Sequence, residues 1–342
     1  MEFRVFGHKP VDRFSATLEL VDLLPFTSVV WEDTFDDIGK LQVVFPKSPD
    51  AFNRIKVGAF GGIPQSSSLM YIHSIEYTDS EIWAYGYEAK ALLQKMASYP
   101  SPIPRGTQSI QTAINNALDY DQKYRYFAKT LTCDFDLGAA NLDAMEYYTL
   151  YDFLQKTLRL SDAGLMTRYN SRHTLDIVAV QSQDVSASVK FSPVLGNMSD
   201  YQYTIDNQSD IYSVKALGLS ADGALIEAMY YGTLPDDNER TSAILDLRSE
   251  YPQPEDVSSG DYFESLMTRA RMSQIARHIN YKLTVKNVDT EQFGTAYKLG
   301  DYVGIALPEL SVTAKMRVAK ATYTCEGTNT KLALTLDKAI IN

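Results

Sequence analysis

The sequence predicts an α+β fold that is mainly β, with two β-rich domains on either side of an α+β module. The clearest signal lies in residues 299–338, where three apolar, β-branched and aromatic runs are separated by Pro308 and by the turn Glu326-Gly327-Thr328-Asn329. This pattern is typical of an antiparallel meander. Similar runs recur between residues 14 and 87, while helical spacing dominates the middle of the chain. An open meander edge is a pairing surface, so the pattern favours an assembly protein over an enzyme.

Residues 1–98 form the first predicted β-rich domain, which ends in a helix. The expected strands cover residues 14–24, 28–31, 41–45, 68–77 and 81–87, with Pro and Gly breaks between them. A helix is expected over residues 88–97, which contain helix formers and no breaker before Pro100. Residues 99–106 then hold three prolines within five positions. We interpret them as a stiff connector and place the first domain boundary there.

Residues 99–188 form the predicted α+β module. Two amphipathic helices are expected, because apolar residues recur at helical spacing in both; they are Ile110, Ala113, Ile114, Ala117 and Leu118 in the first, and Leu150, Phe153, Leu154 and Leu158 in the second. The second helix begins with a capping signal, in which the Thr149 hydroxyl accepts from the third helical amide. Residues 165–169 and 173–180 are predicted to form a hairpin after it.

Residues 189–342 form the second predicted β-rich domain. Strands are expected over residues 199–205, 211–217 and 224–231, followed by a solvated loop over residues 235–240. A long helix is predicted over residues 260–281, and the meander closes the chain. The order β, α+β, β suggests a duplicated architecture, although the sequence contains no clear internal repeat.

Composition limits the classes of function. The chain has 342 residues, a formal net charge of −11 and a pI of about 4.9, which oppose stable binding to a nucleic-acid backbone. Cys133 and Cys325 are too few for a disulfide framework or a zinc site. We expect neither a signal peptide nor a membrane anchor, and hence synthesis in a reducing cytoplasm. The 23 tyrosines suit either partner-facing surfaces or a half-buried sheet.

The sequence offers no catalytic, cofactor-binding or metal-binding residues, and no cofactor is expected. The histidines His8, His73, His173 and His278 are scattered and match no metal or catalytic motif. Acidic pairs occur at Glu32-Asp33, Asp36-Asp37, Asp134 with Asp136, and Asp236-Asp237. Such pairs in turn-like stretches are usually solvated, so we expect no catalytic carboxylates among them.

Three stretches near the two ends of the chain form a recognisable set. They are Trp31 with Gly39 and Leu41-Gln42-Val43-Val44-Phe45-Pro46, residues 71–75 through Tyr85-Gly86-Tyr87-Glu88-Ala89-Lys90-Ala91-Leu92-Leu93, and Leu299-Gly300-Asp301-Tyr302-Val303 with the meander. Together they resemble the tail-hub, or tail-associated, proteins of long-tailed phages and prophages that infect Gram-positive bacteria. Two departures stand out. Gln94-Lys95-Met96 stands where we would expect arginine, and the peptidoglycan-cleaving domain of many relatives is missing.

The resemblance implies a structural baseplate-hub protein of the tail tip without lytic activity. Two tube-like domains per chain, in a homotrimer, would make a ring of six units that joins the hexameric tail tube to a three-fold tip. The implied partners are the distal tail or tail tube protein, the tape-measure protein, and tail-tip or receptor-binding proteins. DNA would pass through the axial channel without specific binding, helped by acidic lining residues.

Two other interpretations remain open. The chain could be a tail-tip carbohydrate-binding module or wall-degrading enzyme, with tyrosines and carboxylates holding cell-wall sugars. A cleft with several aromatic side chains beside two carboxylates would favour this interpretation. The chain could instead be a general β-rich scaffold unrelated to phages.

Overall fold

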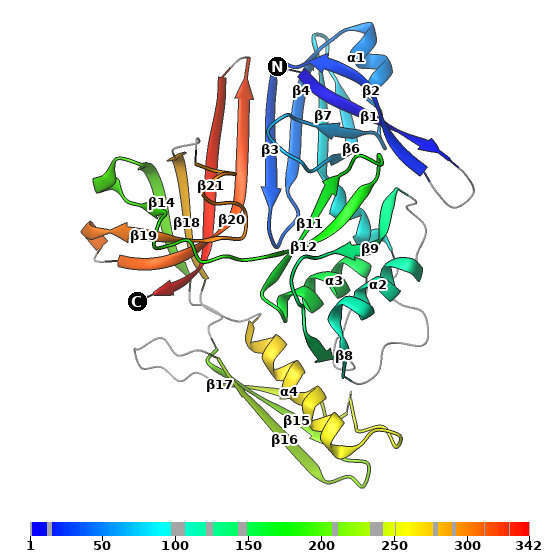
Figure 1. Cartoon of the computed structure of the whole chain (residues 1–342), viewed down its shortest axis with the longest axis vertical. Coiled ribbons are helices and arrows are strands. Elements are labelled where there is room, and N and C mark those ends of the chain that lie inside the picture. The colour runs from blue at the N-terminus through cyan, green and yellow to red at the C-terminus, as the bar shows by residue number, and fades with distance from the viewer. Residues whose placement is uncertain are drawn as a thin grey trace.

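A computed structural model shows an elongated molecule made of three strand-rich or mixed parts and a small inserted module (Figure 1). It describes residues 2–11, 16–96, 107–120, 126–142, 149–206, 211–232, 242–249, 251–275, 280–288, 292–310, 312–327 and 329–341. The expected connector at residues 99–106 and the expected loop at residues 235–240 lie outside these ranges. The fold is mostly β, as the sequence predicts.

The first part, residues 2–96, is a set of antiparallel strands. Its elements are β1 (Glu2–Pro10), β2 (Ala16–Pro25), β3 (Ser28–Thr34), β4 (Lys40–Pro46), α1 (Pro49–Arg54), β5 (Phe60–Gly62), β6 (Met70–Tyr77), β7 (Glu81–Glu88) and the 3-10 helix η1 (Ala89–Lys95). Alternation defines these strands: in β7, every second residue from Ile82 to Glu88 is buried. All five expected strands are present. The sequence analysis missed β1 and β5.

The second part, residues 107–181, is the α+β module. Its elements are β8 (Thr107–Ser109), α2 (Ile110–Tyr120), β9 (Phe127–Thr132), β10 (Ala139–Asn141), α3 (Leu150–Arg159), β11 (Ala163–Tyr169) and β12 (Leu175–Gln181). Both predicted helices and the predicted hairpin are confirmed. The Thr149 hydroxyl accepts from the Asp152 amide at 3.1 Å, as the capping signal predicts. The module shares a hydrophobic core with the first part, through side chains that include Phe60, Leu92 and Phe153.

The last part, residues 182–206 and 280–341, contains the predicted meander. Its elements are β13 (Lys190–Phe191), η2 (Pro193–Leu195), β14 (Met198–Asp206), β18 (Asn280–Val288), β19 (Tyr302–Leu307), η3 (Pro308–Leu310), β20 (Val312–Glu326) and β21 (Asn329–Ile341). Glu326 pairs with Asn329 across the predicted turn, where Gly327 has a φ of 59°. Glycine adopts this left-handed conformation without steric cost.

One large sheet runs through the first and last parts. Its main path is β14-β18-β21-β20-β3-β4-β7-β6-β5-β1-β2, and β19 and β13 branch from β20. The two parts join where β20 pairs with β3 along seven residue pairs, from Lys320 with Thr34 to Glu326 with Ser28. Beneath this seam, Trp31 and Phe45 belong to the same buried cluster as Val318 and Leu334. The two β-rich parts therefore share one sheet and one core within each chain.

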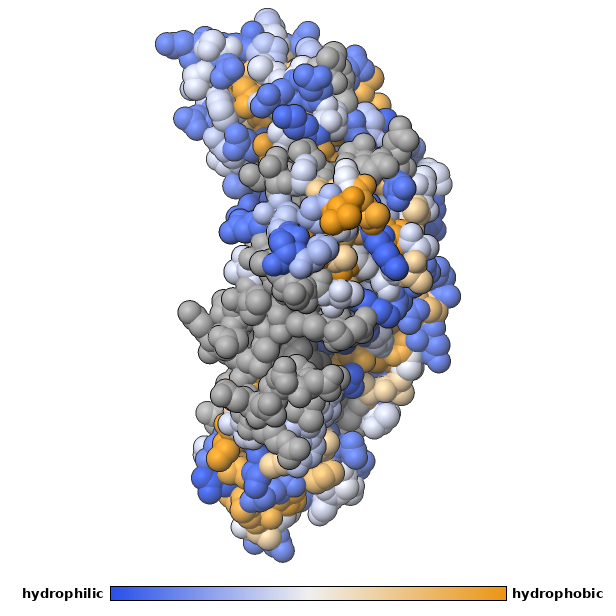
Figure 2. Space-filling model, turned by 90° about the vertical axis from the view of Figure 1, so that its left-hand side faces the viewer, coloured by the Kyte–Doolittle hydropathy of each residue, from blue (hydrophilic) through white to orange (hydrophobic). Residues whose placement is uncertain are grey.

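The inserted module occupies residues 211–275 and stands at the end of a hairpin. Asp206 at the end of β14 pairs with Asn280 at the start of β18, so the module lies between two paired strands. It contains β15 (Ser213–Leu219), β16 (Leu225–Tyr231), β17 (Ser242–Asp246) and α4 (Ser259–Ile275), and it has its own small core. In Figure 2, apolar surface gathers at the lower end of the molecule, where Figure 1 places this module.

Two predicted helices differ from the structure. The helix expected over residues 88–97 is the 3-10 helix η1, because strand pairing extends into its start: the Glu88 amide donates to the Gly39 carbonyl and the Ala89 amide to Leu69. The helix expected over residues 260–281 ends at Ile275. Asn280 and the residue after it belong to β18, where pairing with β14 stabilises the extended backbone. None of the described helices is long and apolar enough to span a membrane.

Candidate functional site

The histidines do not come together. His8 packs edge-on against Tyr126, and His73 stacks on Tyr87 with ring centroids 5.0 Å apart. The Nδ1 atom of His173 lies 2.6 Å from the Tyr169 hydroxyl, and His278 lies outside the described residues. Across the described ranges, no group of three or more His, Cys, Asp or Glu side chains is placed to hold a metal ion.

Two of the acidic pairs are not the solvated turns that the sequence predicts. Asp33 is only 6% exposed, and the Asp36 carboxylate binds a buried arginine, Arg317. The Asp136 carboxylate accepts from the Gly138 amide at 2.8 Å, as a turn residue does. Asp236-Asp237 lies outside the described residues. The burial of Asp33 and the ion pair of Asp36 with Arg317 mark the place where the three parts of the chain meet.

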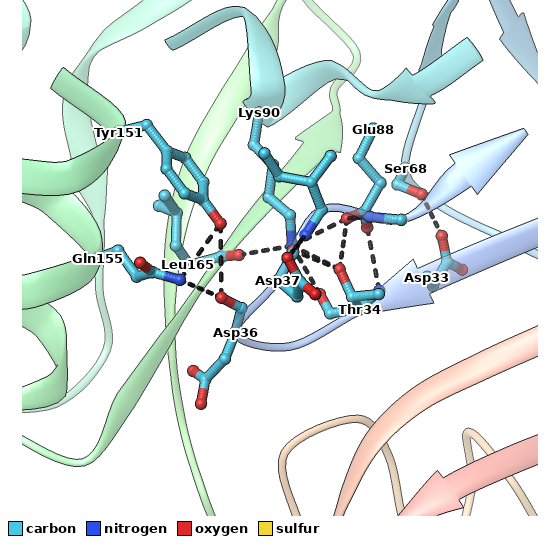
Figure 3. Close-up of polar contacts among 12 residues, drawn as sticks. Asp33, Thr34, Asp36, Asp37, Ser68, Glu88, Lys90, Tyr151, Gln155 and Leu165 are labelled. Atoms are coloured by element: carbon cyan, nitrogen blue, oxygen red, sulfur yellow. Dashed lines mark hydrogen bonds and ion pairs between the residues drawn. The ribbon is translucent and has the colours of Figure 1, made fainter. Parts of the chain in front are cut away.

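We call this meeting place the junction: the loop between β3 and β4 (residues 35–39) together with Glu88, Lys90 and Arg317. Figure 3 shows the part of it around Asp36, Glu88 and Lys90. At its centre, the Lys90 ammonium lies 3.0 Å from the Glu88 carboxylate, with both side chains buried. Lys90 also donates to the carbonyls of Thr34 at 2.7 Å and Leu165 at 3.2 Å. One ammonium thus connects the first part with β11 of the α+β module.

The Glu88 carboxylate accepts hydrogen bonds from both ends of the loop between β3 and β4. It accepts hydrogen bonds from the Thr34 hydroxyl at 2.6 Å, the Thr34 amide at 3.1 Å and the Gly39 amide at 2.7 Å. The Asp36 carbonyl receives donors from α3, namely the Gln155 amide and, at 3.4 Å, the Tyr151 hydroxyl. Buried charges of this kind are tolerated only when hydrogen bonds surround them, and here the loop supplies the bonds.

Arg317 connects the last part to the same loop. Its guanidinium is 1% exposed and lies 2.5 Å from the Asp36 carboxylate and 3.3 Å from that of Asp337. It also lies over the Phe35 ring, 4.8 Å from the centroid. The Phe35 amide donates to the Ala319 carbonyl at 2.9 Å, next to the seam between β3 and β20.

Phe35 is enclosed by glycines from two other parts of the chain. A Cβ atom added at Gly164 of β11 would come within 2.5 Å of the Phe35 ring, and one added at Gly300 within 2.2 Å. Gly300 also has a φ of 92°, which favours glycine. The junction therefore fixes the first part, the α+β module and the last part against one another by packing as well as by charge.

Asp33 is a buried acid beside the junction. Its carboxylate accepts from the indole of Trp31 at 2.8 Å and from the Ser68 hydroxyl at 2.5 Å. Burial, and then the nearby negative charge of Glu88, raise the pKa of Asp33 to about 6, although these hydrogen bonds act in the opposite direction. Asp33 also lines a cavity of about 600 Å³, with Ser66 and Tyr323 among its neighbours there, and its carboxylate is held in place by the Trp31 and Ser68 donors.

The sequence analysis did not single out Lys90, Glu88 or Arg317 as site residues. A usable signal was present, because Glu88-Ala89-Lys90 places two charges inside an otherwise apolar run that continues to Leu93. Charged residues in such runs are seldom fully buried unless they are paired. Arg317 has a similar setting between Met316 and Val318, both of which are completely buried.

The ends of the large sheet are the second candidate functional feature. In the described part of the chain, β2 pairs only with β1, and β14 only with β18. Strand β2 carries three large apolar side chains that are about half exposed: Leu20 at 51%, Val21 at 43% and Leu23 at 43%. An edge strand with unpaired backbone groups and apolar side chains is a surface that another chain can cover.

Comparison with known proteins identifies a family that this chain matches. Residues 116–336 match the model of a family described as Siphovirus ReqiPepy6 Gp37-like protein. No curated protein matches the chain.

Three solved structures share the fold over nearly the whole chain. They are the tail protein from Neisseria meningitidis MC58 (14% identity, 99% of this chain and 97% of that chain, TM-score 0.62), the 43 kDa tail protein of prophage MuSo2 from Shewanella oneidensis (13%, 98% and 98%, 0.61) and the prophage tail protein gp18 from Listeria monocytogenes EGD-e (9%, 99% and 94%, 0.60). The family match covers well over half of the chain, and the expected resemblance to phage tail proteins is confirmed. The chain belongs to the Siphovirus ReqiPepy6 Gp37-like family and is a phage tail protein.

Proposed function

We propose that this tail protein is a non-enzymatic hub at the tail tip, and that three copies form a closed ring joining the tail tube to the tip. The observation that supports this proposal is the single sheet that runs from β2 to β14 through the seam between β3 and β20. Each chain carries two strand-rich parts held rigidly side by side. Three chains would then present six such parts to a hexameric tube.

The two ends of the sheet suggest how the ring closes. A head-to-tail contact between neighbouring copies brings different surfaces together, and a rotation that closes produces a ring rather than a filament. Pairing or covering the β2 edge of one copy with the β14 end of the next would satisfy both open edges. The half-exposed Leu20, Val21 and Leu23 would become buried in that contact.

The junction gives the ring its stiffness. The proposed ring joins a hexameric tail tube to a three-fold tip. It must therefore keep the angle between its strand-rich parts constant when force acts on the tail. Lys90, Glu88 and Arg317 connect all three parts through buried charges, and Phe35 packs between two of them. Interiors packed in this way transmit strain instead of absorbing it.

The proposed partners follow from this position. The tail tube or distal tail protein would bind one side of the ring, the tape-measure protein would end near its channel, and tip or receptor-binding proteins would bind the other side. The net charge of −11 suits a channel through which DNA passes without binding.

Measuring the mass of the purified chain tests the proposal directly. Native mass spectrometry should detect an assembly of three 38.3 kDa chains, alone or after addition of the tail tube protein. Electron microscopy of that assembly should show a ring with an axial channel. A chain that stays monomeric with the tube protein present, or that forms only two-fold dimers, would contradict the ring. Basic or neutral residues along a determined channel would contradict the acidic lining alone.

A further inference from the structure

A groove lies on the outer face of the sheet formed by β3, β4, β7 and β6. Figure 1 shows these strands in the first part of the chain. Its cavity volume is about 820 Å³, within the range of about 300–1,000 Å³ that is usual for small-molecule sites. The loop of the junction closes one end through Asp37 and Ile38. The ring contact proposed at β2 and β14 does not include the residues that line this groove.

The floor of the groove is a row of side chains that crosses four strands. Val30 on β3 is opposite Gln42 on β4, which is opposite Tyr85 on β7, which is opposite Ser74 on β6. Lys40 and Tyr87 form the next cross-strand pair. These positions alternate with ones buried in the core of the large sheet, so they lie on its other face, where Tyr87 also packs against the core shared with the α+β module.

Several polar side chains in the groove have no partner among the residues that the structure describes. Within the described ranges, no side-chain hydrogen bond or ion pair involves Lys40, Gln42, Ser74 or Tyr85. Their groups comprise an ammonium donor, an amide that donates and accepts, and two hydroxyls that do both. A ligand that suits them must offer several hydroxyl or carbonyl groups at close spacing.

Aromatic rings form one wall of the groove. Tyr87 is stacked between His73 and Tyr71, with centroid distances of 5.0 and 5.6 Å and interplanar angles of 15° and 27°. His73 is the extra residue of a β-bulge in β6, between Ile72 and Ser74, and it is exposed. A bulge re-aims a side chain, and here it places the imidazole flat on the tyrosine and at the rim of the groove.

Charges in the groove nearly balance. The Glu32 carboxylate lies 2.8 Å from the ammonium of Lys320, and the Asp37 carboxylate accepts from the Ile38 amide at 2.8 Å. With Lys40 added, the groove has no surplus of positive charge to hold phosphate or another anion. It is also unsuited to an added strand, since β4 and β7 are paired on both sides and their backbone groups are occupied.

From these features, we propose that the groove binds a neutral oligosaccharide. The ring of Tyr85 and the exposed ring of His73, which rests on Tyr87, offer an apolar surface to the C–H face of a sugar, as aromatic side chains with a polar edge do. Gln42, Lys40 and the Tyr85 hydroxyl would bind its hydroxyl groups. The two carboxylates have structural partners, so the site binds sugar without cleaving it. This arrangement combines aromatic side chains with two carboxylates, the combination expected of a sugar-binding cleft.

Isothermal titration of the full-length protein with maltotetraose, chitotetraose and a rhamnose tetrasaccharide tests the proposal, with inorganic tripolyphosphate as the anionic comparison. Saturable binding of at least one tetrasaccharide is expected, with no competition by tripolyphosphate. Tyr85→Ala and Gln42→Ala should each weaken binding about tenfold or more, because each removes a main contact. Tyr77→Ala is the matched control: this tyrosine on β6 is 47% exposed and does not line the groove.

Three results would overturn the proposal. The first is the absence of saturable binding to all three sugars by a protein with a native circular dichroism spectrum. The second is binding that Tyr85→Ala leaves unchanged, which would place the sugar elsewhere. The third is a Tyr85→Ala protein that loses its oligomeric mass while the parent protein binds no sugar, because the groove would then be a contact between copies. The ring and the sugar site can therefore fail independently.

Discussion

The Lys90 ammonium lies 3.0 Å from the Glu88 carboxylate, with only 1% and 3% of these side chains exposed. The two residues are close neighbours in sequence, but their hydrogen bonds extend to Thr34, Gly39 and Leu165. A buried ion pair adds little net stability by itself, because desolvating both charges offsets their attraction. The ion pair instead fixes the positions of its neighbours, because it fits only when the loop between β3 and β4 and strand β11 are both in place.

Removing one partner of this ion pair should strongly lower the free energy of unfolding. Lys90→Met leaves the Glu88 carboxylate buried without its cation, and we expect a loss of about 3–5 kcal/mol in the free energy of unfolding. Urea denaturation followed by circular dichroism measures the loss. Lys129→Met is the matched control: its ion pair with Asp119 is 3.5 Å long with side chains 51% and 70% exposed, so its loss should be below about 1 kcal/mol.

The double variant Lys90→Met/Glu88→Gln separates charge from packing. It should recover part of the lost stability, because no unpaired charge remains in the interior. Equal stability of the Lys90→Met variant and the parent protein would show that the ion pair is not buried in solution.

The stability of the protein should change with pH through Asp33. Its folded pKa of about 6 lies above the ordinary value of 3.8, so between these values the folded state holds a proton that the unfolded state has released. This contribution is complete below pH 3.8 and is lost as pH rises through 6, about 3 kcal/mol in all.

Asp33→Asn removes this titration and can keep the hydrogen bonds from Trp31 and Ser68, which need only an oxygen acceptor. The unfolding free energy of the variant, relative to the parent protein, should therefore rise between pH 4 and pH 7 and then stay level. Denaturation series at several pH values check this comparison, in which other titrating groups cancel. Parallel curves for the two proteins would mean that Asp33 titrates normally.

Sequence pattern located most of the strands because alternation is a local property. In β7 and β21, every second residue faces the core, and Leu332, Leu334 and Leu336 are buried as their spacing predicts. Strands were missed where the pattern is short or mixed. β5 has three residues, and β18 (Asn280–Val288) follows directly on a helical pattern that its start resembles.

The junction could not be predicted in the same way, because its contacts are remote in sequence. Arg317 and Asp36 are 281 positions apart, and Lys90 and Leu165 are 75 apart. Residue types alone do not say which of many acids will meet a given arginine. The sequence around Asp36-Asp37 predicts a solvated turn, because nothing in it indicates that Arg317 of β20 binds the Asp36 carboxylate.

The packing of Phe35 predicts an effect at Gly164, which lies on β11 and whose added Cβ would come within 2.5 Å of the ring. Gly164→Ala should lower the free energy of unfolding by about 1–3 kcal/mol, because the ring must move inside a filled core. Adding Phe35→Leu should restore part of the loss by making room. Gly218 and Gly232 are unsuitable controls since they are also crowded, whereas Gly260 has only the Ser258 hydroxyl at 3.8 Å.

Gly260→Ala, within helix α4, should therefore be neutral or stabilising, because alanine favours helix. Thermal denaturation of both variants gives the comparison. A Gly164→Ala protein as stable as the parent would mean that the Phe35 ring does not occupy the junction.

Substitutions on the exposed edge strand β2 should affect assembly but not folding. In the proposed ring, Val21 and Leu23 on β2 become buried, so Val21→Lys or Leu23→Lys would bury an ammonium at the contact and should shift the mass from trimer to monomer. The monomer should keep its stability within about 0.5 kcal/mol, because both side chains are already 43% exposed. Leu225→Lys is the control, since Leu225 is 52% exposed and lies on β16 of the inserted module, whose sheet is separate from the large one. Sedimentation velocity distinguishes the outcomes. Loss of the trimer in the β2 variants but not in Leu225→Lys would assign the edge to the ring contact, whereas trimers in all three would place the contact elsewhere.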